Sequence, residues 1–259
     1  MTQLVFGSQG LHADPAQGSV TEALVHDDWA TFYPHDMPSA WRLDYYSHFY
    51  GCVFVPQTQW VGWTSAFLEE VAESLEDTPF LWVLQCSLAD KSALARLQWL
   101  VGLPGFEVVQ VLLELDEPAL HSGKMTEAQQ AWQQQLPNDW RVTFSMQASA
   151  VGDVKQWHGE ALAAFAAHNA ANGAANPWIW QGATRSLAGC PLGWFETLPE
   201  TPKQQAGLLQ TFVSELVPSP GQVSQALQTP EDCVGCICGP SVGPQTLREL
   251  KVMAEVMGA

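Results

Sequence analysis

The chain has few basic residues. Only 10 Lys and Arg residues stand against 27 Asp and Glu residues, and the formal net charge at pH 7 is -17. Proteins that bind nucleic acid neutralise backbone phosphates with a Lys- and Arg-rich surface, so this composition argues against a nucleic-acid partner. It also disfavours binding to anionic membranes. The simplest explanation of the acidic charge is solubility.

Long apolar runs are also missing. The first ten residues, MTQLVFGSQG, have neither the basic start nor the apolar core of a signal peptide. No stretch approaches the roughly 18 consecutive apolar residues of a membrane helix, so no membrane partner is expected. We therefore expect a cytoplasmic protein whose six cysteines stay reduced.

What the sequence does contain is an alternation of short apolar runs with amphipathic segments. Cys52–Val55 and Val108–Leu113 are unbroken apolar or near-apolar runs, which are typical of strands buried on both faces. Such alternation predicts a parallel sheet with helical crossovers. The 259 residues fit a single (β/α)8 TIM-barrel-like domain over residues 1–259, and the alternative is an open doubly wound parallel sheet. The pattern is irregular between residues 181 and 199.

Several helix starts are marked by capping residues. Thr64 and Asp90 each precede a helical pattern, and Thr201 with Gln204 forms a capping box. Gly258 follows the last helical pattern and is expected to end it.

The run YYSHFYGCVFVPQTQW resembles part of the YecE-like family, a domain of unknown function. With one inserted residue after Phe49, the run aligns with the family's second strand, and Trp60 stands where the family has Tyr. The matching segments cover roughly the first third of the chain. They are Val53, Val55 and Thr58 in this run, Phe6 to Gly10 at the first strand, and Phe80 to Leu84 at the third.

The resemblance breaks at the family's polar positions. Phe54 stands where the family has Glu, and Pro56 stands where it has Asn. What the resemblance implies is therefore a TIM-barrel-like fold in which the family's acidic site residue is lost. It implies no known reaction.

Polar residues follow most of the predicted strands. In an α/β barrel the site lies at the carboxyl ends of the strands. Neutral amides dominate there, and amides form hydrogen bonds but do not transfer protons near neutral pH. With nearby tryptophans they suit a small polar ligand that resembles a sugar or a nucleoside, and the alternative is that they have ordinary loop and capping roles. The candidate ligand-binding residues are Gln9, Gln57, Thr58, Gln85, Gln147, Trp180, Gln181 and Ser241.

Three carboxylates give an alternative, catalytic hypothesis. Glu114 and Asp116 have the same strand parity, and Glu196 follows a later apolar run. Two carboxylates in different environments can divide the roles of acid and base, so these residues could serve a hydrolase or an isomerase. The competing interpretation is an exposed acidic loop.

Two further patterns complete the candidates. Cys233, Cys236 and Cys238 have a spacing found in zinc and iron–sulfur sites, but a fourth ligand is missing from the pattern. In a strand they would pack as small apolar side chains, and no cofactor is expected. The twelve tryptophans also allow a protein-interaction module that uses a Trp-rich surface. The partner is thus a small polar molecule or a protein, and the oligomeric state stays open.

Overall fold

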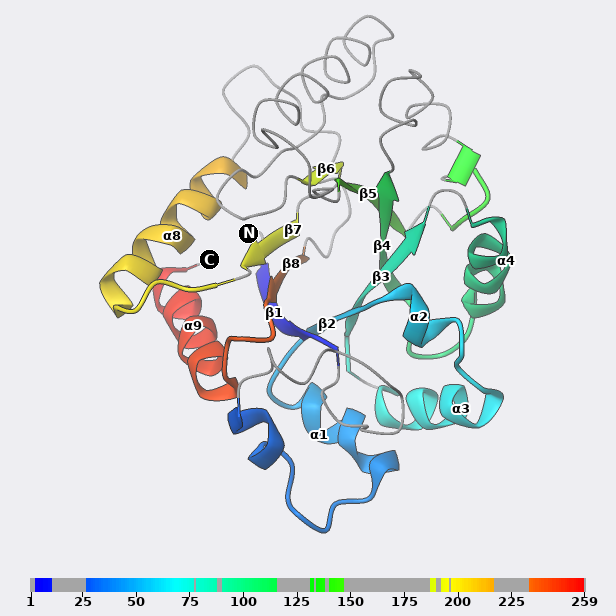
Figure 1. Cartoon of the computed structure of the whole chain (residues 1–259), viewed down its shortest axis with the longest axis horizontal. Coiled ribbons are helices and arrows are strands. Elements are labelled where there is room, and N and C mark those ends of the chain that lie inside the picture. Colours follow the sequence, from blue (N-terminus) through cyan, green and yellow to red (C-terminus); the bar gives the residue numbers. More distant parts are fainter. Residues whose placement is uncertain are drawn as a thin grey trace, which may run out of the picture.

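The computed structural model describes a curled α/β sheet that is covered by helices on its outer face (Figure 1). The residues that it describes are 3–10, 27–76, 78–87, 90–115, 131–132, 134–137, 140–146, 187–189, 192–195, 197–216 and 233–258.

The described strands and helices follow one another in the order predicted for an alternating α/β chain. In chain order they are β1 (Gln3–Gln9), the 3-10 helices η3 (Asp27–Thr31) and η4 (Ser39–Trp41), α1 (Arg42–Ser47), β2 (Cys52–Val55), α2 (Gln57–Trp60), α3 (Ser65–Ser74), β3 (Leu81–Ser87), α4 (Lys91–Leu100), β4 (Val108–Leu115), β5 (Arg141–Met146), β6 (Leu187–Gly189), β7 (Leu192–Phe195), α8 (Pro202–Leu216), β8 (Cys233–Cys238) and α9 (Pro244–Met257).

The sheet has eight strands in the order β6-β5-β4-β3-β2-β1-β8-β7. On one side of β1 the strands follow in chain order from β2 to β5. On the other side of β1 lies β8, and β7 lies beyond β8 at the edge of the sheet. The chain therefore moves around the sheet in one direction. A doubly wound sheet instead reverses direction at its first strand and then moves outward. The described strand order differs from that alternative, and the coarse prediction of a parallel α/β sheet is confirmed.

One strand departs from the expected parallel pattern. β6 pairs antiparallel with β5, whereas every other described pair is parallel. This short strand lies in the region where the sequence pattern is irregular. A regular (β/α)8 barrel has only parallel strands, so β6 departs from that architecture within residues 181–199.

Contacts across the inner face show that the sheet is curled. Phe54 on β2 packs against Trp194 on β7, although β1 and β8 separate these strands in the sheet. The Arg141 guanidinium on β5 donates to the backbone carbonyl of Cys233 on β8. The apolar cluster on this face comprises Cys52, Phe54, Leu81, Val83, Leu112, Leu192, Trp194 and Ile237. Side chains from opposite sides of the curl therefore fill its interior.

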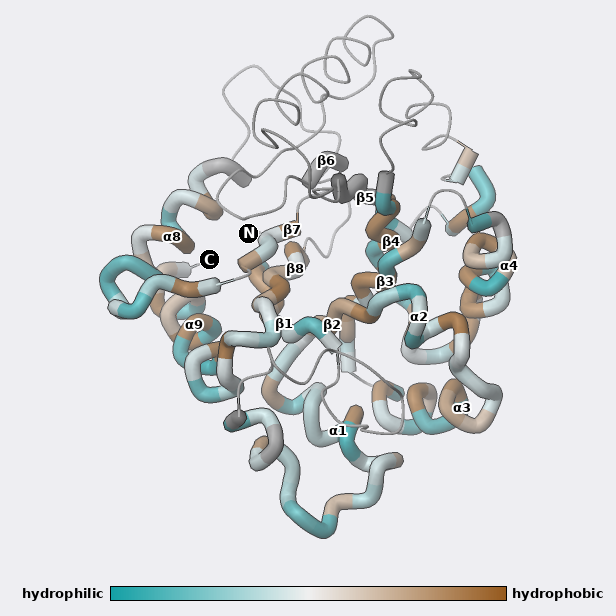
Figure 2. Tube along the Cα trace, in the orientation of Figure 1, coloured by the Kyte–Doolittle hydropathy of each residue, from teal (hydrophilic) through white to brown (hydrophobic). Residues whose placement is uncertain are grey.

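The outer face of the sheet forms a second, larger core with the surrounding helices. Alternate strand residues such as Phe6, Val53 and Trp82 point outward into this core, as the two-residue period of a strand requires. In Figure 1, α9, α1, α3 and α4 form an arc around the strands, and Figure 2 shows hydrophobic strands enclosed by helices of mixed hydropathy.

Local sequence signals fix the helix ends. The Thr64 and Asp90 side chains accept hydrogen bonds from the backbone N–H groups of Phe67 and Ser92, which confirms both as N-caps. Gly258 ends α9 in the left-handed conformation with φ of 74°. The polypeptide in the described part of the chain contains no helix that is long and apolar enough to cross a membrane.

A buried hydroxyl network ties α1 to the first two strands. The Tyr46 hydroxyl accepts a hydrogen bond from the Ser8 N–H at 2.9 Å and donates one to the Cys52 carbonyl at 3.0 Å. Burial raises the pKa of Tyr46 well above its ordinary value, so this hydroxyl stays protonated and remains a donor. The network fixes β1 and β2 beside each other below their carboxyl ends.

Candidate functional site

A pocket lies at the carboxyl ends of β2, β3 and β4. It is an open depression of about 420 Å³. Its lining residues come from α2, from the residue that follows α2, and from the carboxyl ends of β3 and β4. They are Gln57, Thr58, Val61, Gln85, Ser87 and Glu114. The structure thus brings four of the candidate residues together, Gln57, Thr58, Gln85 and Glu114, at the end of the sheet where the sequence places the site.

The pocket is formed where α2 turns away from β2. Pro56 precedes the first helical residue in an extended conformation, so Gln57 and Thr58 begin a short helix directly above the strand. The buried Trp60 indole N–H donates to the Gln85 carbonyl oxygen at 2.7 Å. This bond holds α2 against the end of β3 and places Thr58 and Val61 beside Gln85.

The Gln57 side chain has a structural role at the pocket. Its Oε1 accepts a hydrogen bond from the Ser87 N–H at 2.6 Å, and its Nε2 donates to Asp90 Oδ2 at 2.5 Å. The amide therefore bridges the β2 end to the β3–α4 connection. Hydrogen bonds from Ser92 lower the pKa of Asp90, and the bond from Gln57 adds to this effect. We interpret Gln57 as a residue that shapes the pocket.

Three other lining groups are available to a ligand. The Thr58 hydroxyl, the Gln85 amide and the Ser87 hydroxyl have no hydrogen-bond partner among the residues that the structure describes. Gln85 and Ser87 are two residues apart on β3, so their side chains point to the same face of the sheet. Together they offer hydrogen-bond donors and acceptors without a formal charge.

Sequence reasoning missed Ser87 and Val61 as pocket residues. The apolar run of β3 stops at Leu84, but the strand pairs with β4 as far as Ser87 and Glu114. The alternation of Gln85, buried Cys86 and Ser87 is the signal that could have extended the strand. Val61 carries no such signal, because only the fold of α2 brings it to the pocket.

Glu114 supplies a carboxylate to the pocket. It lies near the end of β4, half-buried, and pairs in register with Ser87. The two other carboxylates of the catalytic hypothesis, Asp116 and Glu196, lie outside the described residues, so their distances to Glu114 are not defined. The hydrolase or isomerase hypothesis therefore stays a prediction.

Two of the remaining ligand-binding candidates, Gln9 and Ser241, do not line this pocket. Gln9 is half-buried at the end of β1 and lies beside Phe54 in register, and Ser241 is exposed in the connection between β8 and α9. Neither lines the pocket. Gln147, Trp180 and Gln181 lie outside the described residues.

The Phe54 side chain fills part of the interior of the curled sheet, below the carboxyl ends of the strands. Its side chain is 5% exposed, and its ring meets the Trp194 ring edge-to-face at a centroid distance of 4.8 Å. In the alignment predicted from the sequence, the YecE-like family has Glu at this position. An apolar contact occupies the position in this structure, and the pocket lies to one side of it, at the ends of β2, β3 and β4.

The three clustered cysteines do not all lie on one face of β8. Cys236 and Cys238 belong to the outer core, whereas Cys233 has the opposite strand parity. Burial raises the pKa of the Cys236 and Cys238 thiols, which disfavours the thiolates that a metal needs. Among the described residues, no group of three His, Cys, Asp or Glu side chains is placed to hold a metal.

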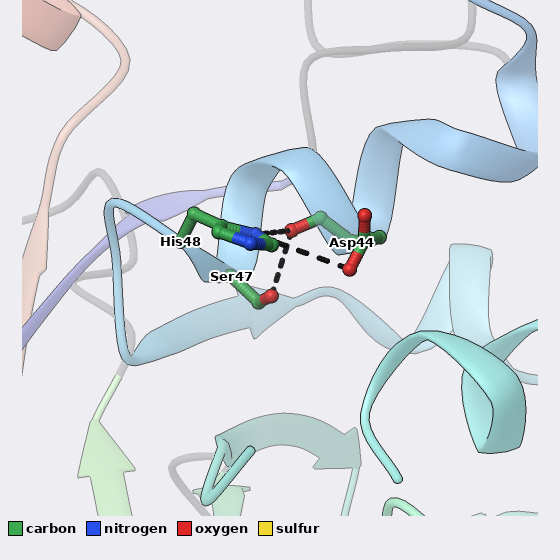
Figure 3. Close-up of polar contacts among 3 residues, drawn as sticks. All are labelled: Asp44, Ser47 and His48. Atoms are coloured by element: carbon green, nitrogen blue, oxygen red, sulfur yellow. Dashed lines mark hydrogen bonds and ion pairs between the residues drawn. The ribbon is translucent and has the colours of Figure 1, made fainter. Parts of the chain in front are cut away.

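A Ser–His–Asp grouping on α1 has the wrong geometry for a catalytic triad. The Ser47 hydroxyl donates to the backbone carbonyl of Asp44 at 2.7 Å and not to the His48 ring (Figure 3). His48 Nδ1 lies 2.7 Å from the same carbonyl oxygen and 3.9 Å from Asp44 Oδ1. In a triad the base instead takes the proton of the serine hydroxyl. These contacts are local interactions on the exposed side of α1, at its carboxyl end.

Three aromatic residues of the segment before α1 do not form an exposed surface. Trp29, Phe32 and Tyr33 are all buried, and the Trp29 indole N–H donates to the Val242 carbonyl at 2.9 Å. This segment packs against the β8–α9 connection. It does not provide the flat aromatic patch that a protein-interaction module would use.

Comparisons with known proteins add no family to this picture. No protein-family model matches the chain, and searches of curated proteins and of solved structures likewise found no match.

Proposed function

We infer that the chain binds a small polar, hydroxyl-bearing molecule, similar to a sugar or a nucleoside, in the pocket above β2, β3 and β4. The observation that carries this proposal is the convergence of the Thr58, Gln85 and Ser87 side chains, whose polar groups have no partner among the described residues. Side chains of this kind orient a ligand by hydrogen bonds and leave its chemistry unchanged.

The size and support of the pocket are consistent with such a ligand. A volume of about 420 Å³ lies within the range of small-molecule sites, roughly 300 to 1,000 Å³. The hydrogen bonds of Gln57 and Trp60 hold the two sides of the pocket at fixed positions. A pre-formed site of this kind loses little free energy in ordering its side chains.

Two broader interpretations accompany the proposal. The single direction of the strand order and the helices outside the curl support a (β/α)8 barrel as the complete architecture. The relationship to the YecE-like family is supported by the aligned sequence segments and stays a prediction.

The test is binding of glucose and of adenosine, each measured by ligand-observed NMR with the wild-type protein and two variants. Gln85→Ala removes an available amide, and one lost hydrogen bond of about 1.4 kcal/mol corresponds to a tenfold weaker affinity. Gln98→Ala, at an exposed position of α4, is the matched control and should bind as the wild type does.

If Gln85→Ala changes the fold, a second variant still tests the contribution of the pocket to binding. Thr58→Val replaces an exposed hydroxyl with a methyl group of similar size, so the fold should persist while affinity falls. Unfolding in urea verifies the fold of each variant. The proposal is wrong if neither probe binds the wild type, or if both pocket variants bind with unchanged affinity.

A further inference from the structure

Two arginines on neighbouring helices are half-buried without a carboxylate partner. Arg42 begins α1 and Arg248 lies in α9. Neither forms an ion pair with any residue that the structure describes, although the chain has 27 Asp and Glu residues. The Nε atom of each is buried and has no hydrogen-bond acceptor among those residues. Withdrawing a positive charge from water is unfavourable unless an anion pairs with it, so both positions favour the binding of an anion.

Aromatic rings hold both guanidinium groups in place. Arg248 Cζ lies 4.0 Å from the ring centroid of Phe49, and Arg42 Cζ lies 5.5 Å from that of Tyr33. The Tyr45 ring contacts both of these rings, at centroid distances of 5.9 Å from Tyr33 and 5.1 Å from Phe49. The two arginines therefore belong to one cluster. A stacked guanidinium loses little further freedom when it pairs with a carboxylate.

The carboxylates nearest to these arginines in the sequence have other contacts. Asp44 Oδ1 lies 3.9 Å from His48 Nδ1 (Figure 3), and Glu249 Oε1 accepts a hydrogen bond of 3.0 Å from the side-chain amide four residues before it. Lys251 Nζ donates to a backbone carbonyl between α1 and β2 at 3.1 Å and adds a third positive charge. A local cationic surface therefore lies on a chain whose net charge is -17.

Exposed apolar side chains accompany the two arginines. Val252 and Val256 follow Arg248 at i+4 and i+8, so they lie along the same side of α9, and they are 56% and 83% exposed. Trp41, directly before Arg42, is 64% exposed. Apolar side chains next to arginines are characteristic of protein-binding surfaces. Because α1 and α9 are neighbours in the arc of helices (Figure 1), we treat these residues as one α1–α9 surface. It comprises Trp41, Arg42, Phe49, Arg248, Val252 and Val256.

We propose that the α1–α9 surface binds an acidic peptide segment of another protein. Carboxylates of the segment pair with Arg42 and Arg248, and its apolar side chains cover Val252 and Val256. The contacts are spread over two helices, which suits a peptide better than a single small anion. The negative charge of the rest of the chain repels an acidic segment and confines it to this surface. None of these residues lines the pocket, so the inference is independent of the proposed function.

The experiment begins with a selection of random peptides displayed on phage. The peptides have about twelve residues, which is long enough to reach across both helices at roughly 3.3 Å per residue. They are selected on the wild-type protein, and those that also bind the double variant Arg42→Gln/Arg248→Gln are removed. The most enriched peptide is then synthesised, together with an analogue in which Asn and Gln replace every Asp and Glu.

Fluorescence anisotropy measures the affinity of both peptides for the wild type and for single variants. The enriched peptide should contain more than one acidic residue, and its uncharged analogue should bind at least tenfold more weakly, because paired charges form the stronger hydrogen bonds. Arg248→Gln should likewise weaken binding of the enriched peptide at least tenfold. Lys203→Gln removes one positive charge at an exposed position of α8 and should change the affinity by less than about twofold.

A further variant tests the surface without altering the arginines. Val252→Ser at its exposed position should keep the fold, as verified by unfolding in urea, and should weaken peptide binding about threefold or more because apolar area is no longer buried. Three outcomes would overturn the inference: no peptide is enriched, the uncharged analogue binds as tightly as the acidic peptide, or Arg248→Gln and Val252→Ser both bind like the wild type. Self-association of the wild type in sedimentation, abolished by Arg248→Gln, would instead assign the surface to a second copy of the chain and would also refute the proposal.

Discussion

Replacing Phe54 tests whether the sheet is curled. The Phe54 ring on β2 contacts Trp194 on β7 at 4.8 Å with the ring planes at 88°. In a flat sheet these strands would be separated by β1 and β8, so their side chains could not touch. Phe54→Ala therefore removes a contact that exists only because the sheet is curled.

The expected cost follows from burial. Phe54 is 5% exposed, and replacing a buried Phe by Ala typically costs about 3–5 kcal/mol, because both apolar contact and volume are lost. Phe54→Leu keeps most of the volume and should cost less than about 1.5 kcal/mol. Trp41 is 64% exposed, so Trp41→Ala should change the free energy of unfolding by no more than about 0.5 kcal/mol.

The assay is urea unfolding of these variants and of a double-mutant cycle between Phe54→Ala and Trp194→Ala. An edge-to-face aromatic pair should give a coupling energy of about 1 kcal/mol. If Phe54→Ala costs less than about 1 kcal/mol and the cycle shows no coupling, β7 does not face β2 across the interior and the curled architecture is wrong.

Three other perturbations probe the framework and the rim of the pocket. A Cβ atom at Gly7 would lie 1.8 Å from the Cys52 carbonyl oxygen, so Gly7→Ala should destabilise the protein by about 3 kcal/mol or more. At Gly207 in α8 a Cβ atom would meet nothing within 4 Å, so Gly207→Ala should stabilise the protein by up to about 1 kcal/mol. Urea unfolding measures both changes. The folded state lowers the pKa of Asp90, so its carboxylate stabilises the fold above the ordinary pKa of about 3.9, and this contribution is lost as the pH falls through the lowered value. The difference in the free energy of unfolding between the wild type and Asp90→Asn should therefore shrink over that acidic range. A constant difference would show that the pKa of Asp90 is not lowered in the folded protein. Burial raises the pKa of four thiols, so iodoacetamide should label them only after unfolding, as mapped by mass spectrometry, and rapid labelling of the native protein would show that they are accessible. They are Cys52, Cys86, Cys236 and Cys238.

Part of the candidate site could be predicted because it depends on local pattern. Gln57, Thr58, Gln85 and Glu114 follow or end apolar runs, and parallel strands bring their carboxyl ends to one edge. The sequence pattern could not show which glutamine amides are bonded within the protein and which face the pocket. Gln57 and Gln85 look alike in the sequence, yet Gln57 is bonded to Ser87 and Asp90 while Gln85 faces the pocket.

The strands and helices also include features that local sequence predicts and features that it does not. The caps at Thr64 and Asp90 form as expected, since each depends on a few neighbouring residues. Cys236 and Cys238 lie buried in strand β8, where they pack as small apolar side chains. The antiparallel pairing of β6 with β5 was not predicted, because strand direction depends on a partner about 45 residues away in the sequence.

The sequence by itself determined the local elements of this protein: which runs are strands, where several helices begin, and which polar residues stand at strand ends. Those features follow from hydrophobic periodicity and capping, which act over a few residues. Only the tertiary structure decided that Phe54 packs on Trp194, that Gln57 bridges two connections, and that Val61 and Ser87 join the pocket. Such contacts join residues distant in sequence, so they are set by the packing of the whole sheet and by which polar atoms find partners within it.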